Sequence, residues 1–370
     1  MSEPLFPIPQ EASDALPPEK TLAGRASRAL LGRFPVWPII DFLSHKSVPK
    51  HKHSAWYAMG GIALFFFGVQ LITGILLMVY YRPSEPWQSV QRIVTEVPYG
   101  NVIRSLHHWA ANLMIFTLFL HLFSTFFMKA YRAPREGTWL TGLGLMGLIM
   151  AFGFSGYLLP WDDLSFFATR VGIAEIEKAP VIGTWIADLV RGGTDVTVDT
   201  IGRFYPLHVV VLPLVVLGLI TLHLTFVQIQ GVSAPDSYYE QPPEKRKSMK
   251  FFTEFLISEI PVWLAMGALL AFLATFFPRG VAPEADPTAA APPNIKPEWY
   301  FLSQYQALKL FPGKLEHLGQ LILGGIPLLA LALPFIDRAR PADKRGRLIA
   351  IGGWFAVAGL IGMTVWGWLS

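Results

Sequence analysis

The fold is decided by two apolar stretches, RSLHHWAANLMIFTLFLHLFSTFF at 104–127 and RFYPLHVVVLPLVVLGLITLHLTF at 203–226. Each contains a pair of widely spaced histidines, and the first also contains His108. The histidines concerned are His107, His121, His208 and His223. A spacing of 14 residues is about four α-helical turns, so the first two project from nearly one face; the second two, 15 apart, depart from one face by about 60°. At 1.5 Å per residue each stretch places its histidines at two levels, about 21 Å apart.

The rest of the chain has the composition of a membrane protein. It is 52% hydrophobic and only 15% charged, and its charges gather in short blocks between long apolar runs. Each run is long enough to cross a hydrocarbon core of about 30 Å, and each is too long for a barrel strand of about 10 residues. The sequence therefore predicts an all-α integral membrane fold with seven transmembrane helices. They are expected at about 56–80, 105–128, 139–158, 206–229, 255–277, 318–336 and 348–369.

The spacing of these runs predicts four parts in the chain. Residues 1–55 form a tail, flexible over 1–24, with a broken amphipathic segment on the membrane surface over 26–45. Residues 56–230 form a four-helix bundle that holds the histidines. Residues 231–253 form a charged connection, and residues 254–370 form a three-helix part. The N-terminus lacks the apolar core of a cleaved signal peptide.

The distribution of positive charge predicts the orientation. The segments 1–55, 129–138, 231–253 and 337–347 hold most of the lysines and arginines, which favours a cytoplasmic N-terminus and an outside C-terminus. On this orientation His107 pairs with His208 at the outer level, and His121 pairs with His223 at the inner level. No basic, aromatic-interleaved patch points to a nucleic-acid partner.

Two pairs of intramembrane histidines at matched depths favour axial ligation of two haem irons. The plainer alternative for any one of them is a hydrogen bond to a backbone carbonyl, and His108 is left unassigned beside His107. Two glycine pairs repeat the 14-residue spacing and would leave room for a flat macrocycle, although small residues also serve close helix packing. These glycines are Gly60, Gly74, Gly142 and Gly156. Arg104 and Arg203 precede the outer histidines, where they would pair with propionates or act as ordinary positive anchors.

Four further stretches give the chain a close resemblance to the cytochrome b family, the core subunit of the quinol-oxidising cytochrome bc and bf complexes. The stretches are YYRPSEPWQSVQRIVTEVPYGNVIRSLHHW (80–109), GYLLPWDD (156–163), RFYPLH (203–208) and PEWY (297–300). The 15-residue histidine spacing, Asp162 after PW, and seven spans are most similar to the chloroplast-type bf branch. In that branch the first four and last three spans are separate chains, whereas here they are fused.

The resemblance breaks at two positions that bear on the cofactors. Where the bf branch has the cysteine that binds an extra haem covalently, this chain has Ala58, and Gln228 replaces the arginine that accompanies that haem. The chain has no cysteine, which excludes a covalent c-type haem and a Cys-ligated iron–sulfur cluster in this chain. We therefore expect two non-covalent b-type haems, held by the four histidines.

The resemblance implies a quinol oxidation pocket on the outer face. Glu298 would accept a quinol proton, and four aromatic residues would line the pocket, each of which could otherwise belong to an interfacial aromatic belt. These are Tyr157, Phe166, Tyr300 and Tyr305. The inner quinone site is less readable, and its candidates by position are Lys247, Lys250, Ser54 and Gln228. For the two lysines, solvated loop charge is the competing interpretation.

The resemblance also implies partners and a place. One electron of each quinol would pass to a Rieske iron–sulfur protein and onward to a c-type cytochrome or another acceptor, and the other would cross the membrane to a second quinone. The complex would be a homodimer in the lipid bilayer of an energy-transducing membrane, the bacterial cytoplasmic membrane. A di-haem membrane anchor of another quinone-linked oxidoreductase would explain the histidines but not PEWY, and a transporter or channel would explain only the spans.

Overall fold

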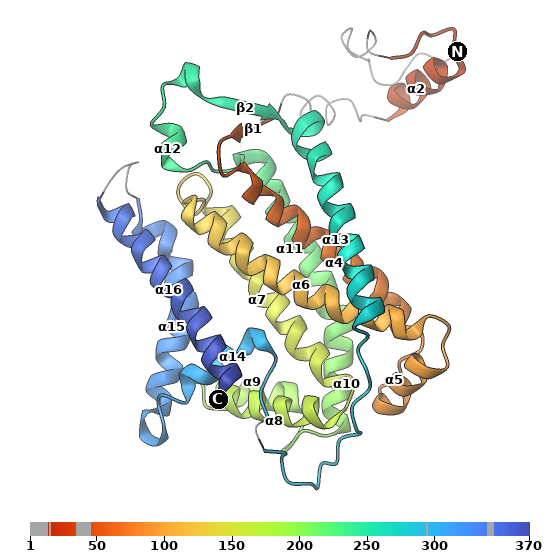
Figure 1. The fold of residues 1–370 in the computed structure, drawn as a ribbon, viewed down its shortest axis with the longest axis vertical. Coiled ribbons are helices and arrows are strands. Elements are labelled where there is room, and N and C mark those ends of the chain that lie inside the picture. The colour runs from red at the N-terminus through yellow and green to blue at the C-terminus, as the bar shows by residue number, and fades with distance from the viewer. Residues whose placement is uncertain (1–13, 15, 35–45, 294, 339–343) are drawn as a thin grey trace.

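The computed structural model describes residues 14, 16–34, 46–293, 295–338 and 344–370. Within them, seven helices are long and apolar enough to cross a membrane, so the predicted all-α fold with seven spans is confirmed. Figure 1 shows these helices running side by side along the long axis of the molecule. Their main helical segments are α4 (Ala58–Met78), α6 (Gly100–Phe127), α7 (Glu136–Leu158), α11 (Leu212–Gln230), α13 (Ile257–Phe276), α15 (Glu316–Ile336) and α16 (Lys344–Leu369).

The first four spans form a bundle of two helix pairs, α4 with α6 and α7 with α11. Its core is apolar between the histidine levels, and fully buried side chains such as Phe66, Ala110 and Val216 meet there. In contrast, large apolar side chains remain exposed on the outer surfaces of the spans, for example Leu214 at 65% and Leu264 at 70%. An apolar surface of this extent marks contact with a membrane or with another protein.

The fourth span begins eight residues earlier than the apolar run suggests, at Val198 rather than 206. The helix extends out of the apolar region because a capping box starts it: the Thr197 and Thr200 side chains satisfy backbone N–H groups at its first turn. The span consists of α10 (Val198–Pro206), a π-helical turn η2 (Leu207–Val211) and α11. A sequence of apolar residues alone gives no sign of this extension.

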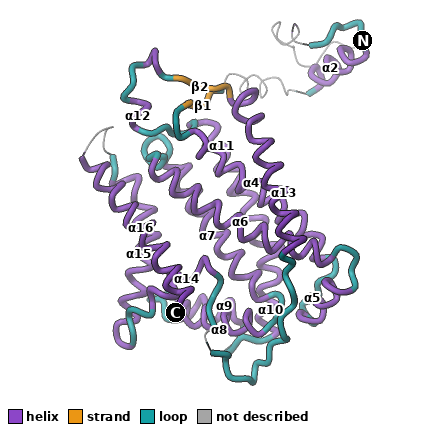
Figure 2. Tube along the Cα trace, viewed as in Figure 1, coloured by secondary structure: helices purple, strands orange, loops and turns teal. Residues whose placement is uncertain are grey.

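The two ends of the bundle differ. One end, here called the loop face, carries short helices between the spans (Figures 1 and 2). These are α5 (Pro86–Thr95), α8 (Asp163–Glu177), α9 (Gly183–Arg191) and α14 (Trp299–Leu308). A second apolar core lies here, with Leu158, Ile201 and Phe204 fully buried. The segment that follows α13 is joined to this core, because Ala285 N–H donates to the Trp161 carbonyl oxygen at 3.1 Å.

The opposite end, here called the sheet face, carries a two-stranded antiparallel sheet, orange in Figure 2. Strand β1 (Ser47–Lys50) precedes the first span, and strand β2 (Lys247–Lys250) precedes the fifth. Around them lie the 3-10 turn η1 (Ser54–Tyr57), helix α12 (Asp236–Tyr239), the 3-10 turn η3 (Pro243–Lys245) and the π-helical turn η4 (Phe251–Leu256). This strand pair joins the two parts of the chain across a long sequence separation.

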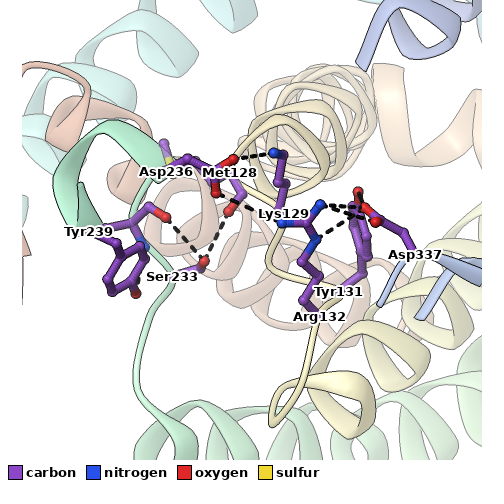
Figure 3. A network of polar contacts seen from close by, with 9 residues as sticks. Met128, Lys129, Tyr131, Arg132, Ser233, Asp236, Tyr239 and Asp337 are labelled. Carbon is purple, nitrogen blue, oxygen red and sulfur yellow. Dashed lines mark hydrogen bonds and ion pairs between the residues drawn. The ribbon is translucent and has the colours of Figure 1, made fainter. Parts of the chain in front are cut away.

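A polar network at the sheet face also holds the two parts together (Figure 3). Asp337, at the end of α15, is fully buried and accepts hydrogen bonds from Arg132 at 2.8 Å and from the Tyr131 hydroxyl at 2.6 Å. Lys129 forms an ion pair with Asp236. The loop between α6 and α7 thereby contacts both the last helices and the connection after α11.

The N-terminal segment forms helix α2 (Leu22–Arg33), whose first turn is capped by the Thr21 hydroxyl accepting from Gly24 N–H at 3.0 Å. The helix begins inside the segment expected to be flexible, so that expectation is wrong from Leu22 onward, because a good N-cap starts the helix there. Of the expected amphipathic segment over 26–45, the part up to Arg33 belongs to α2. Residues 35–45, with the two prolines, lie outside the described residues.

Candidate functional site

The histidine pair nearest the loop face consists of His107 on α6 and His208 in η2. Their ring centroids lie 6.5 Å apart, with an interplanar angle of 67°. Two metal–imidazole bonds of about 2 Å each, together with the radii of the two rings, amount to a separation of this size. The bundle therefore brings together the two histidines that the sequence predicts to be partners.

Both rings of this pair are held by hydroxyl groups. His107 Nδ1 lies 2.9 Å from Thr73 Oγ1, and His208 Nδ1 lies 3.0 Å from Ser155 Oγ. The Thr73 hydroxyl donates its proton to the Val69 carbonyl oxygen at 2.6 Å, so its oxygen accepts from the imidazole. This bond places the ring proton on Nδ1 and leaves the Nε2 lone pair free, which is the tautomer that a metal ligand requires.

The pair nearer the sheet face consists of His121 on α6 and His223 on α11, and these rings lie close enough to interact electrostatically. His223 Nδ1 lies 3.0 Å from Thr141 Oγ1, whose proton is donated to the Gly137 carbonyl oxygen at 2.8 Å. His121 Nδ1 is buried, and no described residue offers it a hydrogen bond. The two levels therefore differ in how firmly their imidazoles are oriented.

Each predicted glycine faces one of the predicted histidines. A Cβ placed on Gly74 would lie 3.4 Å from His107, and one on Gly156 would lie 2.5 Å from His208. At the other level, a Cβ on Gly60 would lie 3.2 Å from His121. Likewise, a Cβ on Gly142 would lie 3.2 Å from His223. The glycines leave space beside each imidazole, so the residues present fit a flat group held between facing imidazoles.

The π-helical turn removes the offset that the sequence predicts for His208 and His223. A π turn contains one residue more than an α turn, so the 15-residue spacing behaves as 14 residues of regular helix. Gly156 and Gly142, which face these histidines from α7, are themselves 14 residues apart. The expected 60° departure is therefore wrong, because a local change of helix type absorbs it.

The arginines before the loop-face histidines contact backbone in this structure. Arg104 donates to the carbonyl oxygens of Arg279 at 2.6 Å and Gly280 at 3.0 Å. Arg203 donates to the Leu189 carbonyl oxygen. These bonds fix the loops around the histidine level, and pairing with propionates stays a prediction.

Glu298 occupies the N-cap position of α14, where its side chain makes no cap hydrogen bond, and lies partly buried at the loop face. Burial raises the pKa of its carboxyl group; Arg279 opposes this rise and Asp162 adds to it. Tyr157 and Tyr300 lie close enough to Glu298 to interact electrostatically with its carboxylate. The structure thus brings three of the predicted quinol-site residues together.

The remaining aromatic candidates lie elsewhere. Phe166 is 1% exposed and packs against Trp161 and Phe167 in the core of the loop face, so its position is that of a core residue. The Tyr305 ring lies under the Lys309 ammonium group, 4.3 Å from ring centroid to Nζ. No contact joins Tyr305 to Glu298 among the interactions of the described residues, and its role stays a prediction.

No hydrogen bond or ion pair among the described residues joins any two of the sequence-predicted residues for a second quinone site. Lys247 and Lys250 lie exposed on β2. The Ser54 hydroxyl accepts from the His51 N–H at 2.8 Å, as part of a turn. Gln228 differs from these three, because its Oε1 is buried without a hydrogen-bond partner.

Glu259 is the functional candidate that the sequence reasoning missed. It lies on α13 and is 4% exposed, and its Oε2 has no hydrogen-bond partner among the residues that the structure describes. A Cβ on Gly61 would collide with this carboxylate, and the Trp263 indole N–H nearby is also unpartnered. Gly61 adjoins Gly60, the glycine that faces His121, so Glu259 lies beside the sheet-face histidine level. A lone carboxylate inside the predicted span 255–277 was the available signal.

Facing imidazoles in a transmembrane bundle, with glycines opposite them, define a membrane electron carrier that binds a planar metal cofactor. The family described as "Cytochrome b/b6/petB" matches residues 43–231, and "Cytochrome b(C-terminal)/b6/petD" matches residues 284–370. The two matches together show that the N- and C-terminal parts are fused in one chain.

Individual relatives agree with these matches. A "Cytochrome bc complex cytochrome b subunit" of Chlorobaculum thiosulfatiphilum is 46% identical over 329 residues, covering 88% of this chain and 76% of that protein. A "Cytochrome b6" of Heliobacterium mobile is 40% identical over 199 residues, covering 53% of this chain and 93% of that protein. A solved structure described as "Hyperthermophilic respiratory Complex III" superposes with a TM-score of 0.80 at 28% identity, covering 91% of this chain and 90% of that one.

The chain belongs to the cytochrome b family. It is the cytochrome b of a bc-type quinol-oxidising oxidoreductase complex, a multi-pass membrane subunit that takes part in electron transfer and works with partner subunits. Membership of the family implies that it binds haem b. The histidine geometry described above fits that cofactor.

Proposed function

We propose that the chain holds two non-covalent haem b groups, one between His107 and His208 and the other between His121 and His223. The single observation that supports this most is the hydrogen bonding of the Nδ1 atoms. Three of the four imidazoles donate Nδ1–H to a hydroxyl oxygen, which leaves Nε2 as the ligand atom. When bound, the haems supply one-electron redox chemistry at two levels of the membrane.

Quinol oxidation is placed at the loop face, beside the first histidine pair. Glu298 accepts a proton from the quinol hydroxyl, since a raised pKa brings a carboxylate closer to the pH at which it must take and release protons. Tyr157 and Tyr300 wall the position and exclude water. The loop that leads to Glu298 offers the proton a way out of the membrane. Electron acceptors are partner subunits: a Rieske iron–sulfur protein, followed by a c-type cytochrome or another acceptor.

Reduction of a second quinone is placed at the sheet face, next to His121 and His223. Glu259 is the carboxyl group best suited to deliver a proton there, because it is buried, unpartnered and next to the glycine that faces His121. The indole N–H of Trp263 supplies a donor to a quinone oxygen. Gln228, also unpartnered, is the only one of the four sequence candidates that we retain.

The sheet face is proposed to be cytoplasmic. Its loops hold most of the chain's lysines and arginines, which puts the N-terminus inside and the C-terminus outside in a bacterial cytoplasmic membrane. Proton release at the loop face and uptake at the sheet face then translocate charge. The complex is proposed to be a homodimer, on the resemblance to the family.

The experiment that tests the proposal is a haem count on the purified complex. A pyridine haemochrome assay is expected to give two non-covalent b haems per chain for the wild type and one for His223→Leu, with normal membrane insertion. Replacement of His317, a histidine outside the bundle, by Leu serves as the matched control and is expected to leave both haems in place. Retention of two bis-histidine haems in His223→Leu would contradict the assignment of ligands.

A further inference from the structure

A pocket of about 370 Å³ lies at the sheet face, between the chain that leads into the first span and the connection that leads into the fifth. Four lysines line it, and no residue of its lining is acidic. They are Lys50, Lys52, Lys245 and Lys247. In Figure 1 the elements that supply the lining, β1, β2 and α12, lie together at the end of the bundle opposite to α14. The pocket is therefore separate from the quinol site at the loop face.

The sheet itself forces two of these charges together. Lys50 and Lys247 are register partners across the antiparallel strands, and like charges directly opposite each other destabilise a sheet. A sheet of only two strands is marginally stable on its own. None of the four lysines forms a salt bridge with a carboxylate of the described residues. The Glu254 side chain accepts the backbone N–H of Lys50 at 2.7 Å and not its ammonium group.

The imidazole of His51, which also lines the pocket, already has hydrogen-bond partners at both ring nitrogens. The Tyr57 hydroxyl donates to the Ser233 carbonyl oxygen at 2.8 Å, so His51 Nε2, 2.7 Å from that hydroxyl, is the donor between them. His51 Nδ1 accepts the His53 N–H at 3.1 Å. Burial, followed by the charge of His53, lowers the pKa of His51. His51 therefore forms a neutral wall, and the lysines alone carry the charge.

The position of the pocket indicates the kind of ligand. The first span begins at Ser54 and the fifth at Phe251, each within a few residues of a lining lysine. The pocket therefore lies at the depth of the lipid headgroups. Basic pockets between membrane helices at this depth bind anionic headgroups, and lysine binds phosphate as a point charge.

We propose that this pocket binds a phosphate-bearing anion, with the headgroup of an anionic phospholipid as the ligand that its depth favours. The bound phosphate would neutralise the opposed Lys50 and Lys247 and so stabilise the β1–β2 strand pair. This strand pair connects the two parts of the chain, which gives the site a role in keeping the parts together. A soluble phosphate compound shares the same chemistry, and the test separates the two sources.

The test uses the intact purified complex, delipidated in a neutral detergent. Thermal unfolding is followed while the complex is titrated with dioctanoyl phosphatidylglycerol, dioctanoyl phosphatidylcholine, or sodium phosphate at constant ionic strength. The variant is Lys50→Gln/Lys247→Gln. The control is Lys20→Gln/Lys314→Gln, which removes two exposed lysines outside the pocket lining. Native mass spectrometry counts the lipids that remain bound.

Phosphatidylglycerol is expected to stabilise the wild type and the control but not the pocket variant, whose apparent affinity should fall about 30-fold for two lost charges. Phosphatidylcholine is expected to have little effect. A lysine-dependent response to sodium phosphate alone would support the phosphate site and identify a soluble ligand. If the wild type and the pocket variant respond equally to all three probes, the proposal is wrong.

Discussion

Thr73 Oγ1 lies 2.9 Å from His107 Nδ1, and the hydroxyl proton is directed to the Val69 carbonyl oxygen. The threonine therefore accepts a hydrogen bond from the imidazole. Such a bond raises the basicity of a ligating nitrogen and fixes the ring. A more basic ligand stabilises the oxidised metal. The hydroxyl residues that accept hydrogen bonds from the histidines should therefore influence the redox potential of the haem at each level.

Thr73→Val removes this acceptor while conserving shape. The midpoint potential of the haem at the loop-face level is expected to rise by roughly 40 mV. This shift corresponds to the loss of a hydrogen bond of about 1 kcal/mol for a one-electron couple. Potentiometric titration of the purified complex resolves the two haems. Thr221→Val, at an exposed threonine of α11, is the control, and equal potentials in the wild type and Thr73→Val would refute the effect.

Gly156→Ala is expected to disturb the loop-face level selectively. The added Cβ would lie 2.5 Å from His208 Cε1, so the imidazole must move, and overpacking of this kind costs about 1–3 kcal/mol. We expect a haem content reduced toward one per chain. The control is Gly218→Ala on α11, where the new Cβ would meet no described atom within 4 Å beyond its chain neighbours and the local helix backbone, and it should keep both haems. Two haems retained in Gly156→Ala would contradict the ligand assignment.

Glu298→Gln is expected to slow quinol oxidation by about 100-fold or more, the lower range for loss of a general base. Both haem spectra should be retained. In the wild type the carboxylate form is active, and burial raises the pKa of Glu298. The rate should therefore fall as the pH drops through a pKa above that of a solvated glutamate, and this limb should vanish in the variant. Stopped-flow reduction measures it; a pH profile that survives in Glu298→Gln would assign the limb to another group.

Glu259→Gln is expected to slow reoxidation of the sheet-face haem by quinone, because the variant lacks the proton donor. Quinol oxidation at the loop face should be unaffected in the first turnover, because the two sites lie at different levels. Flash- or mixing-induced haem reduction, with and without an inhibitor of the loop-face site, separates the two steps. Glu254→Gln, at an exposed carboxylate of the same segment, is the control, and equal reoxidation rates in both variants would eliminate Glu259 as the donor.

Asp337→Asn is expected to destabilise the junction between the two parts of the chain. Asp337 is fully buried, with 0% accessible surface, and it forms an ion pair with the largely buried Arg132. Removing one partner of such a pair costs about 3–5 kcal/mol. The double variant Arg132→Met/Asp337→Leu should be less affected than the single one. Thermal unfolding of the complex checks the order, and a single variant as stable as the wild type would show that the pair is dispensable.

Much of the site could be predicted because its signals are local in the sequence. Histidines in apolar runs, a 14-residue glycine repeat and PEWY are each visible without tertiary structure. Once the helices pack in pairs, these spacings make Gly74 face His107 and Gly142 face His223. The hydroxyl partners Thr73, Thr141 and Ser155 were not predictable, because threonine and serine are frequent in such helices and only the packing shows which of them meet an imidazole.

By itself, then, the sequence determined the seven spans, the four histidines, the family resemblance and the lack of any cysteine. These depend on composition and helical periodicity, which act within one segment. The tertiary structure decided the hydrogen bonds that set the imidazole tautomers, the burial of Glu259 and the opposition of Lys50 to Lys247. Each of these depends on contacts between segments far apart in the chain, and packing alone chooses such contacts.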